Sequence, residues 1–450
     1  MSRDRRSGPR QDRARRGTRS FTAGPLDPPA AGQRLRLRLE GIAQGGEAVG
    51  HHEGRVVFAQ GGLPGEDVLV RLTASRPAYA RGVVEEILVP APERISPHCP
   101  LFGRCGGCHW QYASYLAQLA LKRTIVADQC RHLGGMENPP VAAAIGMDEP
   151  WGYRSTAELH LSPAGQAGYY AAQSHDVVPL AACPLWVPAL QAPLALLQRL
   201  LPEVAAADRP AGVTLRWSWA EGRPLVLIEG NSRRGALRLG EGLAALVPEI
   251  AWRRGPEVQV LSGRGYLCEA LGEEPLQVSP TSFFQVNVPQ ARRLLQTVRA
   301  LLDPCPEDHL LDAYAGVGAL SLPLAGAVRR VTAIESHPAA VADLCQNARR
   351  WTPSGHVEVL PGLVEQVLPQ RAGGYDLVLL DPPRRGCLPA ALAAILAGRP
   401  RRIVYVSCHP GTLARDIRTL QAGGYRLRQV QPLDLFPQTF HVESVALLEC

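Results

Sequence analysis

Three groups that could do chemistry stand just past short apolar runs in the C-terminal half of the chain. Cys408 and Asp381 each follow one such run, and residues 312–318 (DAYAGVG) form a glycine-containing turn after a third. Buried parallel strands end at a common edge of their sheet, and α/β proteins bind their ligands at that edge. We therefore expect these three groups to lie together, with the thiol placed to act as a nucleophile.

The glycine turn predicts a nucleotide-like ligand. Gly316 and Gly318 let a ligand approach the backbone closely, and Glu335, at the end of the next apolar run, could accept hydrogen bonds from a ribose diol. NAD(P) and S-adenosylmethionine both use this arrangement, and the spacing does not separate them. Two prolines after Asp381 stiffen its loop, so its carboxylate has a fixed direction toward a planar ligand edge.

Cys408 and Glu443 are candidates for covalent catalysis. A thiolate attacks soft carbon centres readily, and its pKa falls near cations or a helix N-terminus. Pro410 could open such a helix just beyond the cysteine. Glu443, close to the C-terminus, could act as a base in a dry pocket. The competing interpretation is a cysteine that only packs in the core.

Four cysteines suggest a metal centre. Cys99, Cys105 and Cys108 lie close together among glycines, and Cys183 is the remote fourth. Four thiolates suit an iron–sulfur cluster or Zn²⁺, and the spacing leaves both open. The chain has eleven cysteines but no apolar segment after its basic N-terminus, so we expect neither secretion nor a disulfide framework.

The hydrophobic pattern predicts a multidomain chain that positions these groups. Residues 1–32 read as a disordered basic tail and linker, and residues 33–90 as a small β-barrel of short strands between glycine turns. Residues 91–275 mix strands and helices, as in an α+β domain. From residue 276 to 450 strands and helices alternate, which predicts a mostly parallel, doubly wound α/β sheet.

The charge is concentrated at the N-terminus. The first 20 residues hold eight arginines and two aspartates, so they carry most of the formal net charge of +7. Such a segment could bind phosphates without sequence preference, or it could only aid solubility. No apolar run approaches the roughly 18–20 residues of a membrane span, so we expect no membrane partner and a cytoplasmic protein.

Taken together, these motifs resemble the RNA (uracil-5-)methyltransferases, in particular the iron–sulfur branch that acts on 23S ribosomal RNA. The resemblance covers residues 33–450. It implies a TRAM (OB-like) β-barrel, an α+β central domain with an iron–sulfur cluster and a C-terminal class I methyltransferase domain. The motifs that carry it are the runs at residues 105–108 (CGGC), 282–287 (SFFQVN), 381–384 (DPPR), 404–408 (VYVSC) and 436–443 (FPQTFHVE).

The resemblance also implies roles for single residues. Cys408 would attack C6 of the uracil and Glu443 would remove the C5 proton, the uridine being flipped out of its stack. S-adenosylmethionine would supply the methyl group, and the four cysteines would hold a [4Fe–4S] cluster in a monomeric enzyme. The residues expected to bind the methyl donor are Gln285, Tyr314, Gly316, Glu335 and Asp381.

Three positions depart from the family pattern. His409 stands where asparagine is usual after the nucleophile, Ala315 stands where cysteine is common, and Ala319 stands where a polar contact to the donor is usual. Three alternatives remain: the same reaction on a tRNA uridine, a non-catalytic iron–sulfur RNA-binding protein, and an NAD-dependent oxidoreductase. The last two leave Cys408 and Glu443 without a role.

Overall fold

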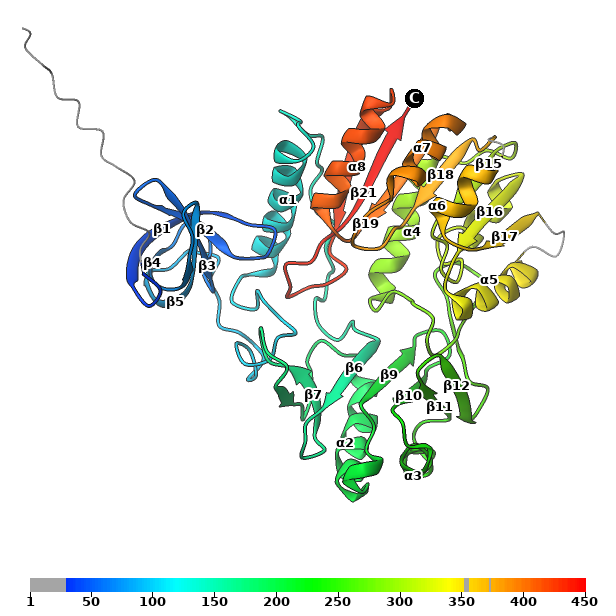
Figure 1. Ribbon diagram of the computed structural model, residues 1–450, viewed down its shortest axis with the longest axis horizontal. Coiled ribbons are helices and arrows are strands. Elements are labelled where there is room, and N and C mark those ends of the chain that lie inside the picture. The colour runs from blue at the N-terminus through cyan, green and yellow to red at the C-terminus, as the bar shows by residue number, and fades with distance from the viewer. Residues whose placement is uncertain (1–29, 352–355, 372–373) are drawn as a thin grey trace, which may run out of the picture.

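The computed structural model describes residues 30–351, 356–371 and 374–450, arranged as a small barrel, a central sheet and a larger C-terminal sheet (Figure 1). Most of the predicted basic tail, residues 1–32, lies outside the described residues. Within the described residues no helix is both long and apolar enough to cross a membrane.

The N-terminal unit is a closed barrel of five strands in the order β1-β2-β3-β5-β4. Along β1 every second residue is a leucine that points inward, so Leu35, Leu37 and Leu39 are buried while the residues between them are exposed. The predicted barrel is confirmed. Its strands are β1 (Arg34–Ile42), β2 (Ala48–His52), β3 (Arg55–Gln60), β4 (Asp67–Ser75) and β5 (Tyr79–Val89).

The outward arginines of β1 are largely engaged with acids of the barrel itself. Arg34 forms an ion pair with Glu85 (2.7 Å between Nε and Oε2), and Arg38 forms one with Asp67 (3.4 Å). An arginine that is already paired has less charge to offer a phosphate. The alternation along β1 therefore marks a solvated barrel face more than a basic RNA-binding stripe.

The central unit is a seven-stranded sheet in the order β12-β11-β10-β9-β6-β7-β8, antiparallel except between β10 and β11. Its strands are β6 (Thr156–Leu161), β7 (Ala167–Tyr170), β8 (Val177–Pro179), β9 (Gly212–Ser218), β10 (Arg223–Glu229), β11 (Glu249–Arg254) and β12 (Glu257–Ser262). Its helices are α2 (Gln191–Leu200), α3 (Arg233–Leu243) and the 3₁₀ helices η1 (Pro188–Leu190), η2 (Leu201–Glu203) and η3 (Ala206–Asp208).

The C-terminal unit is a seven-stranded sheet in the order β17-β16-β15-β18-β19-β21-β20, of which the first five strands are parallel. The strands are β15 (His309–Asp312), β16 (Arg330–Glu335), β17 (Val357–Pro361), β18 (Leu377–Leu380), β19 (Arg402–Ser407), β20 (Arg426–Leu433) and β21 (Glu443–Glu449), and a two-stranded ribbon, β13 (Leu267–Glu269) and β14 (Leu276–Val278), precedes them. The helices are α4 (Val288–Leu302), α5 (Pro338–Trp351), α6 (Val364–Val367), α7 (Pro389–Gly398), α8 (Pro410–Ala422) and the 3₁₀ helices η4 (Leu322–Ala327) and η5 (Leu368–Gln370).

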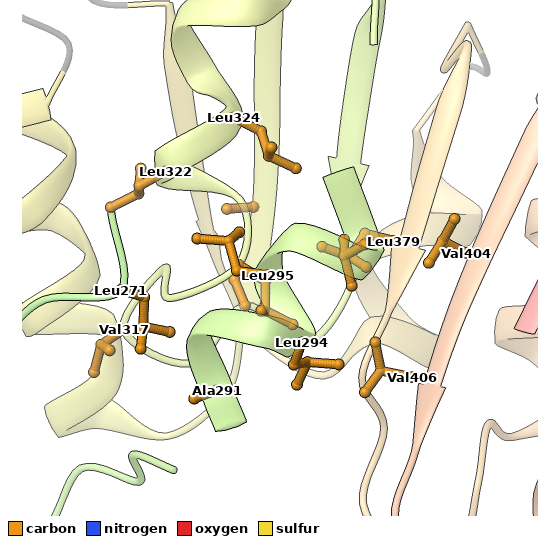
Figure 2. Packing of buried hydrophobic residues seen from close by; sticks show 14 of the residues in the cluster. Leu271, Ala291, Leu294, Leu295, Val317, Leu322, Leu324, Leu379, Val404 and Val406 are labelled. Carbon is orange, nitrogen blue, oxygen red and sulfur yellow. The ribbon is translucent and has the colours of Figure 1, made fainter. Parts of the chain in front are cut away.

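Alternate residues of these strands form two cores, one on each face of the sheet. Leu379 and Val404 pack with Leu294 of α4 on one face, as Figure 2 shows. Leu380 and Tyr405 pack with α7 and α8 on the other. Helices on both faces make the sheet doubly wound, as the βα pattern predicted.

Helix α1 (Tyr115–His132) contributes to the second of these cores. It belongs to the range that the sequence assigned to the central domain, yet Val126, Ala127 and Cys130 are buried with residues of α8 and β20. Figure 1 shows α1 standing beside α8, between the barrel and the C-terminal sheet. The segment between barrel and central sheet therefore joins all three units.

Candidate active site

Four neighbouring strands present polar side chains at one edge of the C-terminal sheet. β15 ends at Asp312 and β16 at Glu335, while Asp381 directly follows β18 and Cys408 directly follows β19. The four strands pair in parallel, so their carboxyl ends meet. The structure thus brings together the thiol, the acid and the glycine turn that the sequence placed at a common edge.

The glycine turn is held open by Glu335. One oxygen of its carboxylate accepts a hydrogen bond from the Gly316 backbone N–H (2.8 Å), and the other accepts two from the start of the following loop. Gly318 has φ of +87°, and a Cβ there would lie 2.5 Å from Leu322. Only glycine fits at that position, so the turn keeps its backbone accessible to a ligand.

Asp312 and Asp381 form a pair of carboxyl groups beside this turn. Burial raises the pKa of Asp312 to about 7, the nearby Ser321 hydroxyl opposes the rise, and the charge of Glu335 adds to it. Burial and the charge of Asp312 raise the pKa of the half-buried Asp381 to about 7. Two neighbouring carboxyls that resist ionisation would be stabilised in their charged form by a cationic ligand.

Glu443 begins β21, the strand next to β19, whose end leads into Cys408. β19 and β21 pair in antiparallel register as far as Ser407 opposite Ser444, so Cys408 and Glu443 are the next residues beyond that last pair, and the charge of Glu443 acts on the Cys408 thiol. Glu443 is only 3% exposed, and its Oε1 has no hydrogen-bond partner among the described residues. A buried carboxyl oxygen without a partner is rare, and it points to a functional role.

Burial and the charges around Cys408 keep its thiol protonated. Burial raises the pKa of Cys408 to about 11, with Glu443 and then Asp381 adding to the rise and Arg384 opposing it. Burial also raises the pKa of Glu443, and the nearby Asp381 reinforces the effect. At neutral pH the thiol is therefore protonated and the two carboxyls do not both ionise, so the site holds protons that a reaction can move.

A cavity of about 270 Å³ opens beside the thiol. Its walls are residues 408–410 and 440–442, Arg384, Ile125 from α1 and residues 44–45 from the barrel. Arg384 places its Nη2 3.2 Å from His441 Nδ1, which gives one wall a positive charge. The volume lies just below the roughly 300–1,000 Å³ of a typical ligand pocket and suits one flat ring better than an extended molecule.

Helix α1 holds the loop that leads to Glu443. Lys122, the single lysine of the chain, is fully buried and forms an ion pair with Asp434. One turn earlier, Gln118 donates to Gln438 Oε1 (3.0 Å) and accepts from the Gln438 backbone N–H (2.9 Å). Removing one partner of a buried ion pair costs about 3–5 kcal/mol. The loop is therefore firmly attached to α1.

The two remaining candidates for donor binding are Gln285 and Tyr314. Gln285 is half-buried on the loop before α4, and Tyr314 is half-buried within the glycine turn itself. Asp343 of α5 fixes the Gln285 loop, because its carboxylate accepts hydrogen bonds from the Ser279 N–H (2.7 Å) and the Ser282 hydroxyl (2.6 Å). Both side chains are thus carried by segments with a defined backbone.

The four predicted metal ligands line a second cavity, of about 220 Å³. Cys99, Cys105, Cys108 and Cys183 all face it as free thiols. Burial raises the pKa of Cys108 to about 12 and that of Cys183 to about 11. In the part of the chain that is described, no three or more His, Cys, Asp or Glu side chains are arranged to hold a metal ion. The chemistry of the donor set, four sulfurs around one cavity, still fits iron or zinc.

Several residues of the site escaped the sequence analysis. Gln44 and Lys122 lie far from Cys408 in the chain. Nothing in the residues around them predicts that Gln44 lines the cavity or that Lys122 holds the loop before Glu443. Asp312 was noted only as the start of a turn. A polar residue at the carboxyl end of a buried strand is a signal that could have identified it as a ligand-facing acid.

Three family models match parts of the chain. Residues 372–450 match the model described as tRNA (Uracil-5-)-methyltransferase, and residues 30–84 match the TRAM domain. Residues 291–408 match a model described as conserved hypothetical protein 95. The first match includes Cys408 and Glu443, and the second covers most of the barrel.

Similar proteins extend over nearly the whole chain. An uncharacterised RNA methyltransferase of Thermosynechococcus vestitus is 37% identical, over 93% of this chain and 98% of that protein. Another, from Gloeobacter violaceus, is also 37% identical, over 94% and 99%. Among solved structures, the Pyrococcus abyssi tRNA (uracil-54, C5)-methyltransferase in complex with S-adenosyl-L-homocysteine has a TM-score of 0.71 at 24% identity, covering 92% of this chain and 100% of that one. That likeness extends the shared fold across the barrel and both sheets.

Proposed function

Because this chain belongs to the RNA (uracil-5-)methyltransferase family, we propose that it methylates C5 of a specific uridine in 23S rRNA through a covalent bond between Cys408 and uracil C6. The methyl donor of the family is S-adenosylmethionine. The observation that carries the covalent mechanism is the register of β19 and β21, which sets the thiol beside a buried carboxyl group with a free oxygen.

The proposed reaction turns uracil C5, a poor nucleophile, into a good one. With S-adenosylmethionine bound, the positive charge of its sulfonium would let Asp381 and Glu443 both ionise. The Cys408 thiol then loses its proton to the neighbouring Asp381 carboxylate, and the sulfur adds to C6, which moves the C5–C6 electron pair into an enolate. C5 then attacks the methyl group of S-adenosylmethionine, and neutral S-adenosylhomocysteine leaves. Glu443 takes the C5 proton, the C5–C6 double bond re-forms, and Cys408 leaves and regains its proton from Asp381.

Five residues at the sheet edge would bind the methyl donor. The open turn at Gly316 lets the donor approach the backbone, and Glu335 is positioned to accept bonds from its ribose. Asp381 would face the sulfonium, and Gln285 and Tyr314 would contact the rest of the molecule. This proposal is supported by the carboxyl pair, which lacks a cationic partner among the described residues and would gain one with the sulfonium.

We expect donor affinity to rise with pH. Asp312 and Asp381, with pKa values of about 7, must ionise to stabilise the sulfonium, so affinity for S-adenosylmethionine should increase about tenfold from pH 6 to pH 8. Binding at pH 7 should release protons, which calorimetry in buffers of different ionisation enthalpy measures. S-adenosylhomocysteine, which lacks the sulfonium charge, is the control and should show a smaller dependence. Equal pH profiles for the two ligands would contradict this role for the carboxyl pair.

Two classes of RNA are candidates for the substrate, 23S rRNA and tRNA. The iron–sulfur branch that the motifs resemble acts on 23S rRNA, whereas the C-terminal family model and the Pyrococcus abyssi enzyme are described by tRNA. A tRNA uridine is therefore the second candidate. In either case the barrel (33–90) and central region (91–275) would hold the RNA around the Cys408 cavity, whose size suits a single flipped base.

A deletion strain decides between the two RNAs. We expect one or more 5-methyluridines to disappear from 23S rRNA on deletion of the gene and to return on complementation. Mapping the modification in both rRNA and tRNA by mass spectrometry measures this, and a Cys408→Ala complementing gene is the matched control. Loss confined to tRNA would select the second candidate, and no loss in either RNA would overturn the proposed activity.

We also propose that Cys99, Cys105, Cys108 and Cys183 hold a [4Fe–4S] cluster. Support comes from the four thiols around one cavity of about 220 Å³ and from their contribution by two segments that are 74 residues apart in sequence. Bound there, a cluster would supply a structural cross-link between these segments, because methyl transfer needs no electron. Methyl transfer itself requires only the residues at the sheet edge.

Iron analysis tests this centre. Protein purified without oxygen should be brown and contain about four iron atoms per chain. Cys183→Ser should lose most of the iron and the visible absorbance, whereas Cys305→Ser, an exposed cysteine outside the cavity, should keep both. Stoichiometric zinc in place of iron would refute the cluster and leave a zinc site.

A further inference from the structure

The barrel forms one wall of the catalytic cavity. Gln44 and Gly45, in the loop between β1 and β2, line the same cavity as Cys408. The next residue, Gly46, is packed so tightly that a Cβ would lie 2.7 Å from the Phe440 ring, and its carbonyl accepts a hydrogen bond from Trp110 Nε1 (3.1 Å). The β1–β2 loop is thus fixed against the C-terminal domain and completes the cavity.

Gln44 reaches across this wall to the residue after the nucleophile. The structure has its amide nitrogen, Nε2, 2.9 Å from His409 Nε2. His409 in turn caps helix α8, because its Nδ1 lies 3.2 Å from the Thr412 backbone N–H. A ring nitrogen that accepts a hydrogen bond carries no proton, so the proton of the neutral imidazole is on Nε2.

The position of that proton determines which way the Gln44 amide faces. Burial, followed by the positive charge of Arg384, lowers the pKa of His409, which keeps the ring neutral. Nε2–H is then a donor and cannot face a second donor, so the Gln44 amide is turned round from the placement above: its oxygen faces His409 Nε2, and its NH₂ takes the place of the oxygen, next to Gly411. The oxygen and nitrogen of an amide are assigned from such contacts. Gln44 makes no other hydrogen bond with a described residue, so its NH₂ remains available.

We propose that Gln44 of the barrel is a specificity-determining residue, which donates a hydrogen bond from its amide to a carbonyl oxygen of the target pyrimidine while His409 holds the amide in position. This inference rests on the proposed function, since it takes the occupant of the cavity to be a uracil. Uracil offers two acceptors, O2 and O4. A donor at O4 would also stabilise the charge that forms there when the thiolate adds to C6.

In this arrangement the barrel contacts the target base as well as the RNA backbone, and His409 positions Gln44. A barrel that only bound RNA phosphates would not need a loop fixed against Phe440 or an amide beside the nucleophile. His409, which departs from the asparagine usual at this position, can accept from the α8 backbone and donate to Gln44 at the same time, because its two ring nitrogens point in different directions.

The test couples a change in Gln44 to a change in the base. Gln44→Met removes the amide, and Gln44→Glu can still accept from His409 but cannot donate when ionised. The substrate is a short RNA hairpin carrying the uridine identified by mapping, made with uridine, 2-thiouridine or 4-thiouridine at that position. Sulfur accepts hydrogen bonds poorly, so one thio substitution should slow wild-type methylation about tenfold to a hundredfold.

In both Gln44 variants we expect the methylation rate on uridine RNA to fall about as much as the thio substitution slows the wild type. We expect no further fall in rate when these variants act on that thio-substituted RNA. Gln60→Met is the control, because Gln60 is an exposed barrel glutamine on β3 that does not line the cavity, and it should behave as wild type. If the thio effect persists in Gln44→Met, or wild type shows none at either oxygen, Gln44 makes no contact with the base and the inference is overturned. A wild-type protein that fails on uridine RNA would instead overturn the proposed function.

Discussion

Cys408→Ala should abolish methyl transfer, with a loss of roughly four to six orders of magnitude in turnover. Without a sulfur at C6 the uracil cannot form the enolate, and C5 stays too weak a nucleophile to take the methyl group. RNA and S-adenosylmethionine affinities should change less than about twofold, because the variant removes one atom from a cavity wall. Transfer of a labelled methyl group to RNA measures the first effect, and filter binding measures the second.

Cys345→Ala is the matched control for the nucleophile. Cys345 is a half-buried cysteine on α5, away from the cavity walls, so its loss should leave turnover within about twofold of wild type. Full turnover by Cys408→Ala on a uridine substrate would sink the covalent mechanism. Loss of RNA binding together with activity would show that the variant damages the fold, and an unchanged melting temperature excludes this.

The parts of the site that could be read from the sequence are those carried by local pattern. Leucines that alternate with charged residues from Gln33 to Glu40 predict the first barrel strand, and apolar runs followed by polar turns predict the edge where Asp381 and Cys408 meet. These predictions succeed because the burial pattern of a strand is visible in the types of a few consecutive residues. A period of two needs only a few positions to be visible.

The parts that could not be read depend on how distant segments pack. Nothing local to Lys122 shows that it will pair with Asp434, more than 300 residues later, or that α1 will join the core of the C-terminal sheet. The β1–β2 loop likewise reads as an ordinary glycine turn until Gln44 meets His409. Pairing of Arg34 and Arg38 with acids on other strands also required the barrel register.

Register decides the position of Glu443, the proposed base, in the same way. Glu443 is 35 residues from Cys408, and an acid near a chain end is usually a solvated one. The antiparallel pairing of Ser407 with Ser444 turns it into a buried residue beside the nucleophile. A slip of one residue would point the carboxyl to the other face of the sheet, so its catalytic role depends on the whole sheet rather than on its neighbours.

Glu443→Gln should trap the reaction after methyl transfer. The amide keeps the size of the side chain but cannot take the C5 proton, so the C5–C6 double bond cannot re-form and Cys408 cannot leave. We expect a covalent protein–RNA complex that carries the transferred methyl group and survives denaturing electrophoresis. The fold should tolerate the change, since Glu443 is a buried acid with a raised pKa and an unpaired oxygen.

Two comparisons make the trapping experiment decisive. Label from the S-adenosylmethionine methyl group should migrate with the slower protein–RNA band, which places the block after methyl transfer and before elimination. The double variant Cys408→Ala with Glu443→Gln should give no band, because the bond runs through the sulfur. Normal release of 5-methyluridine by Glu443→Gln, with no complex, would remove Glu443 as the base and require another group to take the C5 proton.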